Sequence, residues 1–515
     1  MHRKLKWFLL PALLLIIPTG LSAEEKLSSD IKKVMERPMF RHSIWGILAV
    51  DLESGETVCE LNADKMFKPG STTKVFTVAA ALSILGADFR FKTPVYRCGN
   101  LTESGKLQGD LILVGSGDIT LGGRTTEDGH IAFKDIDHSH ANIIEDAQLT
   151  RPYPAAGIGQ LAKQVAKSGI KKVGGEVIVD ERLYDAETIQ QTSLNPVMIN
   201  DNMIDLVITP TKLGLPANVK WRPQSSFYQI DVLVMTVEKG QPTQIDISTP
   251  GSRQIVLRGQ ISIGDDPVVR VVSVEDPASF ARSLFIEALL REGIELTAST
   301  INVNPIKLLP PKTKYKDFPL VAKHVSLPFS EYARLILKVS HNEGANTLIP
   351  LMSLHEGNGT YEDGFRVESD FFSKAGIDLS SVSLADGAGG DPGDLFSPRA
   401  IVDLLGFMTS RPEYAVLREA MPILGVDGSL AEAVKPASPA RGKVHAKTGT
   451  IISFNRLKNI QILSAKGLAG YMSTASGRNL SFAIFVNNTP VESLDEAFAV
   501  GHTLGEIVEL IYKTQ

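Results

Sequence analysis

The chain has 515 residues, more than one hydrophobic core usually accommodates, so several domains are expected. Hydrophobic residues make up 43% and charged residues 22%, which is typical of a soluble globular protein. The formal net charge of -5 supplies no basic field for nucleic acid and argues against a DNA or RNA partner.

The N-terminus has the layout of a secretory signal peptide. Basic residues precede a short apolar run at residues 7–17, and small residues ending at Ala23 precede a polar segment. We therefore expect cleavage after Ala23 and export to the periplasm. An uncleaved membrane anchor is the alternative interpretation.

The sequence contains two cysteines, Cys59 and Cys98. Export would permit a disulfide between them, but two cysteines do not make a disulfide scaffold. Two unpaired, buried thiols are the alternative.

The first predicted elements are a buried strand at residues 44–52 and a returning strand at 57–61. A helix is predicted from Ser71 to residue 85, where Gly86 ends it. Residues 93–306 then show short β-like runs, split by Gly, Asp and Pro, and two helices at 158–168 and 277–292. This texture predicts one or two inserted, β-rich domains.

Helical periodicity resumes near residue 328 and continues to residue 408. Two strands, at 467–474 and 480–486, are predicted to form a hairpin, and an amphipathic helix follows at 493–512. Strands at both ends with helices between them predict one discontinuous α/β domain, whose sheet is made from both ends of the chain.

Ser71 and Lys74 can meet, because residues three apart lie on the same face of a helix. A serine is a poor nucleophile unless a base takes its proton, and a lysine is a base only when its pKa is lowered. An N-cap serine and a solvated lysine are the commoner arrangement. Of three S-x-x-K matches, starting at Ser29, Ser71 and Ser168, only the second opens a helix that continues as an apolar run.

The segment Lys447-Thr448-Gly449 supplies a second cation that would lower the pKa of the first lysine. Gly449 would let a substrate backbone come close. Thr450 would offer its backbone N–H to an oxyanion, together with the N–H of Ser71. An ordinary strand end is the alternative.

A third element, Ser340-His341-Asn342, follows a predicted helix. Its hydroxyl would pass a proton between two lysines, and its carboxamide would hold a substrate amide. S-x-N is weak by itself, because Ser193 and Ser453 also begin such triplets.

Taken in order, these three motifs resemble those of the active-site serine penicillin-binding proteins and serine β-lactamases. The middle motif is S-H-N here, rather than S-D-N. The long insertion between Ser71 and Ser340 is similar to that of the class-C low-molecular-mass penicillin-binding proteins, the three-domain D-alanyl-D-alanine carboxypeptidase/endopeptidase family. Further stretches resemble that family at residues 109–121 (GDLILVGSGDITL), 386–389 (DGAG), 424–430 (LGVDGSL) and 470–471 (GY).

The resemblance implies an α/β (α+β) fold: a β-lactamase/transpeptidase-like domain, with an antiparallel sheet flanked by helices, that carries two inserted β-rich domains. The implied catalytic domain spans residues 24–92 and 310–515. Inserted domain II spans residues 93–205 and 260–309, and inserted domain III spans residues 206–259.

The resemblance also implies a mechanism, in which Ser71 attacks the carbonyl of a D-Ala-D-X bond in a peptidoglycan stem peptide and Lys74 takes its proton. Ser340 and Lys447 relay a proton to the leaving amine. Asn342 and Gly449 contact the substrate, and Lys447 holds the terminal carboxylate with Thr448 or Thr450. β-Lactams would trap Ser71, and no metal or organic cofactor is implied. A β-lactamase and a catalytically silent peptidoglycan-binding protein are the alternatives, although no Glu-x-x-Leu-Asn element is present.

Three features depart from the family pattern or stand outside it. Residues 180–202 lack the tryptophan that the family often has there, so no residue is assigned to read a diamino-acid side chain. Residues 451–466 are longer than is typical and are expected to form a surface excursion rather than a loop over the site. The DIDHSH segment, residues 135–140, contains metal-ligand types but is expected to be a solvated polar loop. His341 and His445 are expected to line the site or to pack beside it.

Overall fold

The computed structural model describes residues 26–144, 146–184, 187–189 and 192–515. The predicted signal peptide lies outside these residues. Within the described part of the chain, no helix is long and apolar enough to cross a membrane.

The central sheet joins the two ends of the chain, as the sequence predicts. Its strand order is β19-β20-β21-β1-β2, with the short β22 beside β20, and all its pairs are antiparallel. These strands are β1 (Ile44–Asp51), β2 (Thr57–Leu61), β19 (Val444–Asn455), β20 (Ile460–Ser473), β21 (Asn479–Asn487) and β22 (Thr489–Val491). The α/β prediction, with an antiparallel sheet flanked by helices, is confirmed.

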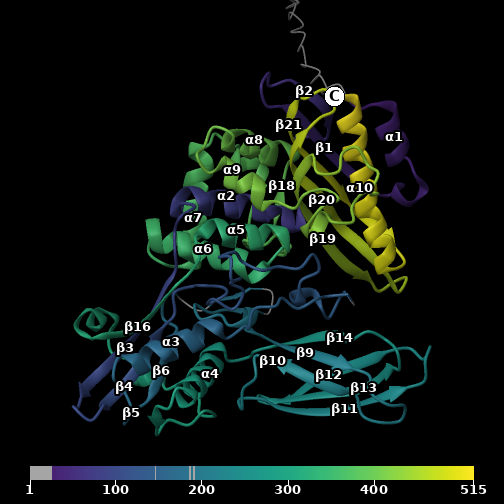
Figure 1. Cartoon of the computed structure of the whole chain (residues 1–515). Coiled ribbons are helices and arrows are strands. Elements are labelled where there is room, and N and C mark those ends of the chain that lie inside the picture. The colour runs from purple at the N-terminus through teal and green to yellow at the C-terminus, as the bar shows by residue number, and fades with distance from the viewer. Residues whose placement is uncertain (1–25, 145, 185–186, 190–191) are drawn as a thin grey trace, which may run out of the picture.

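Helices cover both faces of this sheet (Figure 1). One face packs against α1 (Ser29–Met35) and α10 (Leu494–Thr514). The other face packs against a helical layer made of α2 (Lys74–Leu85), α5 (Phe329–Lys338), α6 (Asn342–Glu356), α7 (Tyr361–Lys374), α8 (Pro398–Met408) and α9 (Tyr414–Ala420). Helix α2 is apolar all round and lies in the middle of this layer, with every residue from Lys74 to Leu82 buried.

The part of the chain inserted between α2 and α5 lies below the central sheet in Figure 1. This inserted part contains a mixed sheet of order β15-β5-β4-β3-β16, with β6 beside β4. Its strands are β3 (Lys92–Leu101), β4 (Lys106–Val114), β5 (Lys172–Val173), β6 (Val177–Asp180), β15 (Glu295–Leu296) and β16 (Leu320–Val325). Helices α3 (Ala156–Lys167) and α4 (Pro277–Arg291) share a hydrophobic core with it.

Two three-stranded sheets complete the inserted part, in the orders β10-β9-β14 and β11-β13-β12. Their strands are β9 (Met203–Thr209), β10 (Asn218–Arg222), β11 (Gln229–Val237), β12 (Gln244–Gly251), β13 (Gln254–Ser262) and β14 (Val268–Ser273). The remaining two-stranded pairs are β7 (Glu187–Ile189) with β8 (Thr192–Leu194), and β17 (Val382–Ser383) with β18 (Leu395–Phe396).

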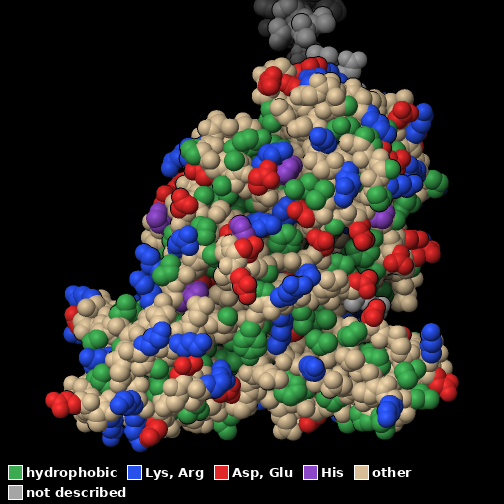
Figure 2. Space-filling model, in the orientation of Figure 1, with side chains coloured by type: hydrophobic (Ala, Val, Ile, Leu, Met, Phe, Trp, Pro, Cys, Tyr) green, Lys and Arg blue, Asp and Glu red, His purple; other side chains and the backbone are tan. Residues whose placement is uncertain are grey.

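The strands answer two questions that the sequence left open: whether the two cysteines are paired, and what residues 451–466 form. Cys59, on β2, and Cys98, on β3, belong to different sheets, and both thiols are free. Residues 451–466 form a surface excursion, as expected, because most of residues 452–459 are exposed. They continue β19 and β20 as an antiparallel ladder with a register shift at Ile451 and Ile452, which extends to the pair Asn455 and Ile460. On the face seen in Figure 2, acidic and basic side chains are interspersed.

Candidate active site

Ser71 lies on a tight turn between the sheet and the central helix. Residues Gly70–Thr73 form a 3-10 turn, and α2 begins at Lys74 rather than at Ser71 as the sequence predicts. Gly70 adopts a φ of 53°, and a Cβ on it would lie 2.7 Å from the backbone nitrogen of Thr450. The turn carrying Ser71 therefore lies directly against β19.

Gly449 makes the same approach from the other side. A Cβ on Gly449 would collide with the carbonyl oxygen of Pro69 and would lie 3.1 Å from the nitrogen of Thr72. The sequence assigned this glycine to the close approach of a substrate backbone. In the structure, the space on that side is filled by the turn that carries Ser71.

Lys74 is completely buried at the start of α2 and has three hydrogen-bond acceptors. Its Nζ donates to Ser71 Oγ at 2.8 Å, to Asn342 Oδ1 at 2.7 Å and to the carbonyl oxygen of Ala388 at 2.8 Å. Burial lowers the pKa of Lys74 to about 7, although Asp386 and Glu343 oppose the shift. A lysine with this pKa is a competent base near neutral pH.

Lys447 is also completely buried, on β19. Its Nζ donates to Ser340 Oγ at 2.9 Å and to the carbonyl oxygen of Thr448 at 2.7 Å. Burial, followed by the charges of Lys74 and Lys466, holds the pKa of Lys447 well below its ordinary value. The charge of Lys74 thus lowers the proton affinity of Lys447, whereas the pKa of Lys74 itself is lowered by burial.

Ser340 and Asn342 lie on the turn between α5 and α6. Asn342 is the first residue of α6, and its carboxamide oxygen accepts from Lys74. Ser340 has a φ of 63°, which is uncommon for a residue with a side chain. The sequence predicts a substrate contact for Asn342, and the structure adds a direct hydrogen bond from Lys74.

The two threonines after Lys447 have hydrogen-bond partners that the sequence motifs did not assign to them. Thr448 Oγ1 lies 2.8 Å from Ser429 Oγ, in the LGVDGSL segment. Thr450 Oγ1 accepts from Lys466 Nζ at 3.1 Å. Lys466 lies on β20 opposite Thr450, and burial lowers its pKa to about 8. No sequence signal marks Lys466, because it reaches Thr450 only through the pairing of β19 with β20.

The DGAG segment shapes the wall behind Lys74. The Asp386 carboxylate accepts backbone N–H bonds from Ala388, Gly389 and Gly390, which turns the Ala388 carbonyl toward Lys74 Nζ. Burial, together with the nearby Asp386, raises the pKa of Asp394 to about 8. The DGAG motif, to which the sequence assigned no role, therefore positions a hydrogen-bond acceptor for Lys74.

The prediction of a solvated loop at residues 135–140 is wrong. Asp137 and His138 are buried, Asp135 accepts from the N–H of Gly428, and His140 Nε2 lies 3.2 Å from the carbonyl oxygen of Val339. Asp135, by contrast, is exposed, and the segment contacts the turns that carry Ser340 and residues 428–430. His445 is buried as well, with Nδ1 at 3.1 Å from the carbonyl oxygen of Arg418, which is the packing role expected for it.

Asp137, His138 and Asp201 bring three metal-ligating side chains together. The guanidinium of Arg124 occupies the position among them that a metal ion would need. It binds both oxygens of Asp137 at 2.7 and 2.9 Å and one oxygen of Asp201 at 2.6 Å. The carboxylate charge is neutralised by this arginine, so the donor set does not fit a metal ion.

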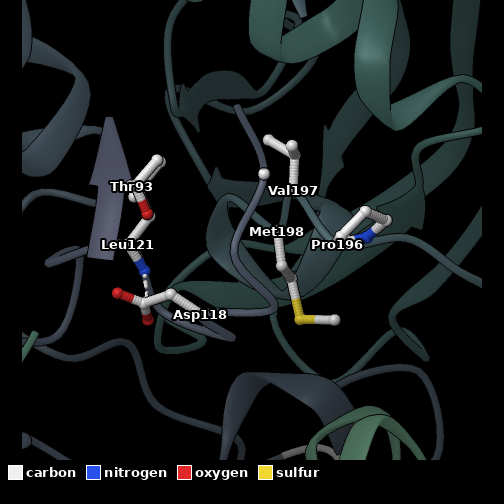
Figure 3. Close-up of a pocket in the computed structure, with 7 residues that line it drawn as sticks. Thr93, Asp118, Leu121, Pro196, Val197 and Met198 are labelled. Carbon is white, nitrogen blue, oxygen red and sulfur yellow. Dashed lines mark hydrogen bonds between the residues drawn. The ribbon is translucent and has the colours of Figure 1, made fainter. Parts of the chain in front are cut away.

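The inserted part contains a small crevice (Figure 3). Thr93, Gly115, Asp118, Leu121 and residues 196–198 line it, and it leaves no room for a water molecule. The Asp118 carboxylate accepts from the N–H groups of Thr120 and Leu121. The crevice is therefore a gap within a tightly packed turn and is not a ligand site.

Comparisons with known proteins agree with this geometry. The profile of the D-Ala-D-Ala carboxypeptidase 3 (S13) family matches residues 27–501. The D-alanyl-D-alanine carboxypeptidase of Actinomadura sp. (strain R39) is 27% identical over 488 residues, which cover 90% of this chain and 81% of that protein. D-alanyl-D-alanine carboxypeptidase DacB of Haemophilus influenzae is 24% identical over 472 residues, which cover 87% of this chain and 86% of that protein.

The fold is also similar to that of a solved structure, penicillin binding protein 4 (dacB) from Haemophilus influenzae. The TM-score is 0.71 at 21% identity, with 94% of this chain and 99% of that chain covered. Because the family profile spans nearly the whole described chain, this protein belongs to the D-Ala-D-Ala carboxypeptidase 3 (S13) family.

Proposed function

We propose that the chain is a serine-type D-Ala-D-Ala carboxypeptidase, with D,D-endopeptidase activity, that cleaves peptidoglycan stem peptides through an acyl-enzyme on Ser71. The observation that carries the proposal is the 2.8 Å hydrogen bond between Ser71 Oγ and Lys74, a completely buried lysine whose pKa is lowered to about 7. Membership of the family supports the carboxypeptidase function over the β-lactamase and silent-binder alternatives.

The acylation step follows from this contact. Neutral Lys74 takes the proton of Ser71 Oγ, and the oxygen attacks the carbonyl carbon of the D-Ala-D-X bond. The N–H groups of Ser71 and Thr450 stabilise the oxyanion that forms. The close packing of Gly70 against the Thr450 nitrogen supports this role, because it places the two backbone segments side by side.

The second lysine serves the leaving group and the substrate carboxylate. The proton that Lys74 took from Ser71 is relayed through Ser340 Oγ, held by Lys447, to the departing amine, so both lysines return to their starting protonation states. Lys447, Thr448 and Thr450 bind the terminal carboxylate of the substrate. Asn342 uses its carboxamide oxygen for Lys74 and its amide nitrogen for a substrate carbonyl. Water then hydrolyses the acyl-enzyme.

The proposal extends to the organisation of the chain. A signal peptide ending at Ala23 directs export to the periplasm. The catalytic domain carries inserted domain II and inserted domain III, as the family resemblance implies. Because β16 pairs with β3, we place the return to the catalytic domain after Val325 rather than at residue 310.

Labelling with fluorescent penicillin tests the function. The purified chain is expected to form a stable adduct that maps to the peptide containing Ser71, and to release D-Ala from a stem pentapeptide. Ser71→Ala is expected to do neither. Consumption of the drug without an adduct would favour a β-lactamase, and an intact drug without an adduct would favour a silent binding protein.

The rate of acylation is expected to depend on pH through Lys74. Only the neutral amine accepts the Ser71 proton, and its pKa is about 7. The rate should therefore rise with pH and reach half its plateau near pH 7. Stopped-flow measurements of penicillin acylation across neutral pH check this profile, and a rate that stays constant on the acid side would exclude Lys74 as the base.

A further inference from the structure

The middle residue of the Ser340-His341-Asn342 turn is tied to two parts of the molecule. His341 is buried and caps α6, where its Nδ1 accepts the N–H of Gly344 at 2.8 Å. Its Nε2 lies 3.2 Å from Oδ1 of Asp201, which belongs to the inserted part of the chain. A single imidazole therefore connects the catalytic turn with the inserted part.

Asp201 is itself held in a buried network of charges. Its Oδ2 accepts from Arg124 at 2.6 Å and lies 2.7 Å from Nε2 of His138. The other ring nitrogen of His138 lies 2.6 Å from Oδ1 of Asp205, and these carboxylates raise the pKa of His138 to about 10 despite its burial. Two cations thus face one oxygen of Asp201 and hold its pKa well below the ordinary value.

These partners assign one tautomer to His341. Nε2 of His341 faces the ionised Asp201 at 3.2 Å without the alignment of a hydrogen bond, and the negative charge of the carboxylate favours a proton on Nε2. The N–H of Gly344 requires a lone pair on Nδ1. Both demands are met by a ring that carries a proton on Nε2; although burial opposes the shift, the charge of Asp201 raises the pKa of His341.

The backbone on both sides of this contact is in an uncommon conformation. Ser340 has a φ of 63°, and Asn200, Asp201 and Asn202 have φ values of 55°, 55° and 51°. Residues with side chains hold such angles only when surrounding contacts impose them. The His341–Asp201 contact lies between these two segments and joins them.

We infer that Asp201 is a positioning residue that acts through His341. It holds the turn so that Ser340 Oγ stays on Lys447 and Asn342 Oδ1 stays on Lys74. The inference rests on the proposed function, because it concerns the speed with which that site acylates. Asp201, a residue of the inserted part, thus helps to position the side chains of the active site.

The test compares two isosteric changes in the same charge network. Asp201→Asn removes the carboxylate that faces His341 and is expected to slow acylation by fluorescent penicillin about tenfold. Asp137→Asn also weakens the network around Arg124, but Asp137 has no contact with His341. This matched control is expected to acylate within about twofold of the unsubstituted protein, whatever its melting temperature.

A double-mutant cycle separates positioning from general damage. His341→Asn keeps a side chain that can cap α6. If Asp201 acts through His341, Asp201→Asn should have little further effect on acylation in the His341→Asn background. Additive effects, an equal loss in Asp137→Asn, or an unchanged rate in Asp201→Asn would each overturn the inference.

Two controls complete the design. If Asp201→Asn does not fold, His341→Asn carries the test, and unchanged acylation in that variant overturns the inference. Labelling of the unsubstituted protein but not of Ser71→Ala shows that the proposed nucleophile is correct. A failed inference is thus distinguishable from a failed function.

Discussion

Replacing Lys74 with methionine is expected to slow acylation of Ser71 by a factor on the order of 10²–10⁴, because the site loses its general base. Methionine is similar in length and carries no charge, so it should fill the buried volume without the desolvation cost of an ammonium. Acylation should therefore be lost while the melting temperature is kept. The measurement is the rate constant of penicillin acylation, with thermal melting of the same sample.

A second substitution distinguishes a base from a positive charge at this position. Lys74→Arg keeps the charge beside Ser71 but supplies a group that does not deprotonate in proteins. It should be as slow as Lys74→Met. A folded Lys74→Met variant that acylates within about tenfold of the unsubstituted protein would remove Lys74 from the proposed base role.

Lys447→Met is expected to reduce turnover of a D-Ala-D-Ala peptide on the order of a hundredfold. The change removes the donor to Ser340 Oγ and the cation proposed to bind the terminal carboxylate. Both steps use the same Nζ, so kcat and the Michaelis constant should deteriorate together. Steady-state release of D-Ala from a stem pentapeptide provides the measurement.

Lys466→Met is the matched control for this prediction. Lys466 is a buried lysine on the neighbouring strand, and it lies close enough to lower the pKa of Lys447. Its Nζ donates to Thr450 Oγ1 at 3.1 Å. Its loss should reduce turnover less than about tenfold. Equal losses in the two variants would show that positive charge alone matters in this region.

The proposed catalytic residues could be identified in the sequence because they occur in short, ordered motifs. The spacing of Ser71 and Lys74 follows from the helix repeat, and the apolar run after them predicts a buried helix. The three motifs also occur in an order that resembles a known family. The central sheet could be predicted as well, since its buried strands at the two ends of the chain need partners.

Other residues gained their roles only through folding. The DIDHSH segment is polar, and a polar segment is usually solvated, yet Asp137 is buried with Arg124 and His138 is buried with Asp201 and Asp205. Residues 451–466 form a hairpin because the ladder of β19 and β20 continues beyond the site, with a register shift at Ile451 and Ile452. Gly449 contacts the Ser71 turn, and no local pattern showed that contact.

The sequence by itself determined the nucleophile candidate, its base and the fold class, because these depend on local spacing and on the burial of apolar segments. The tertiary structure alone decided which charges are paired. The bond of Lys466 to Thr450 and the contact of His341 with Asp201 join residues far apart in the chain. Such pairs form only after the sheet and the inserted part bring distant segments into the same low-dielectric interior, where an unpaired charge is costly.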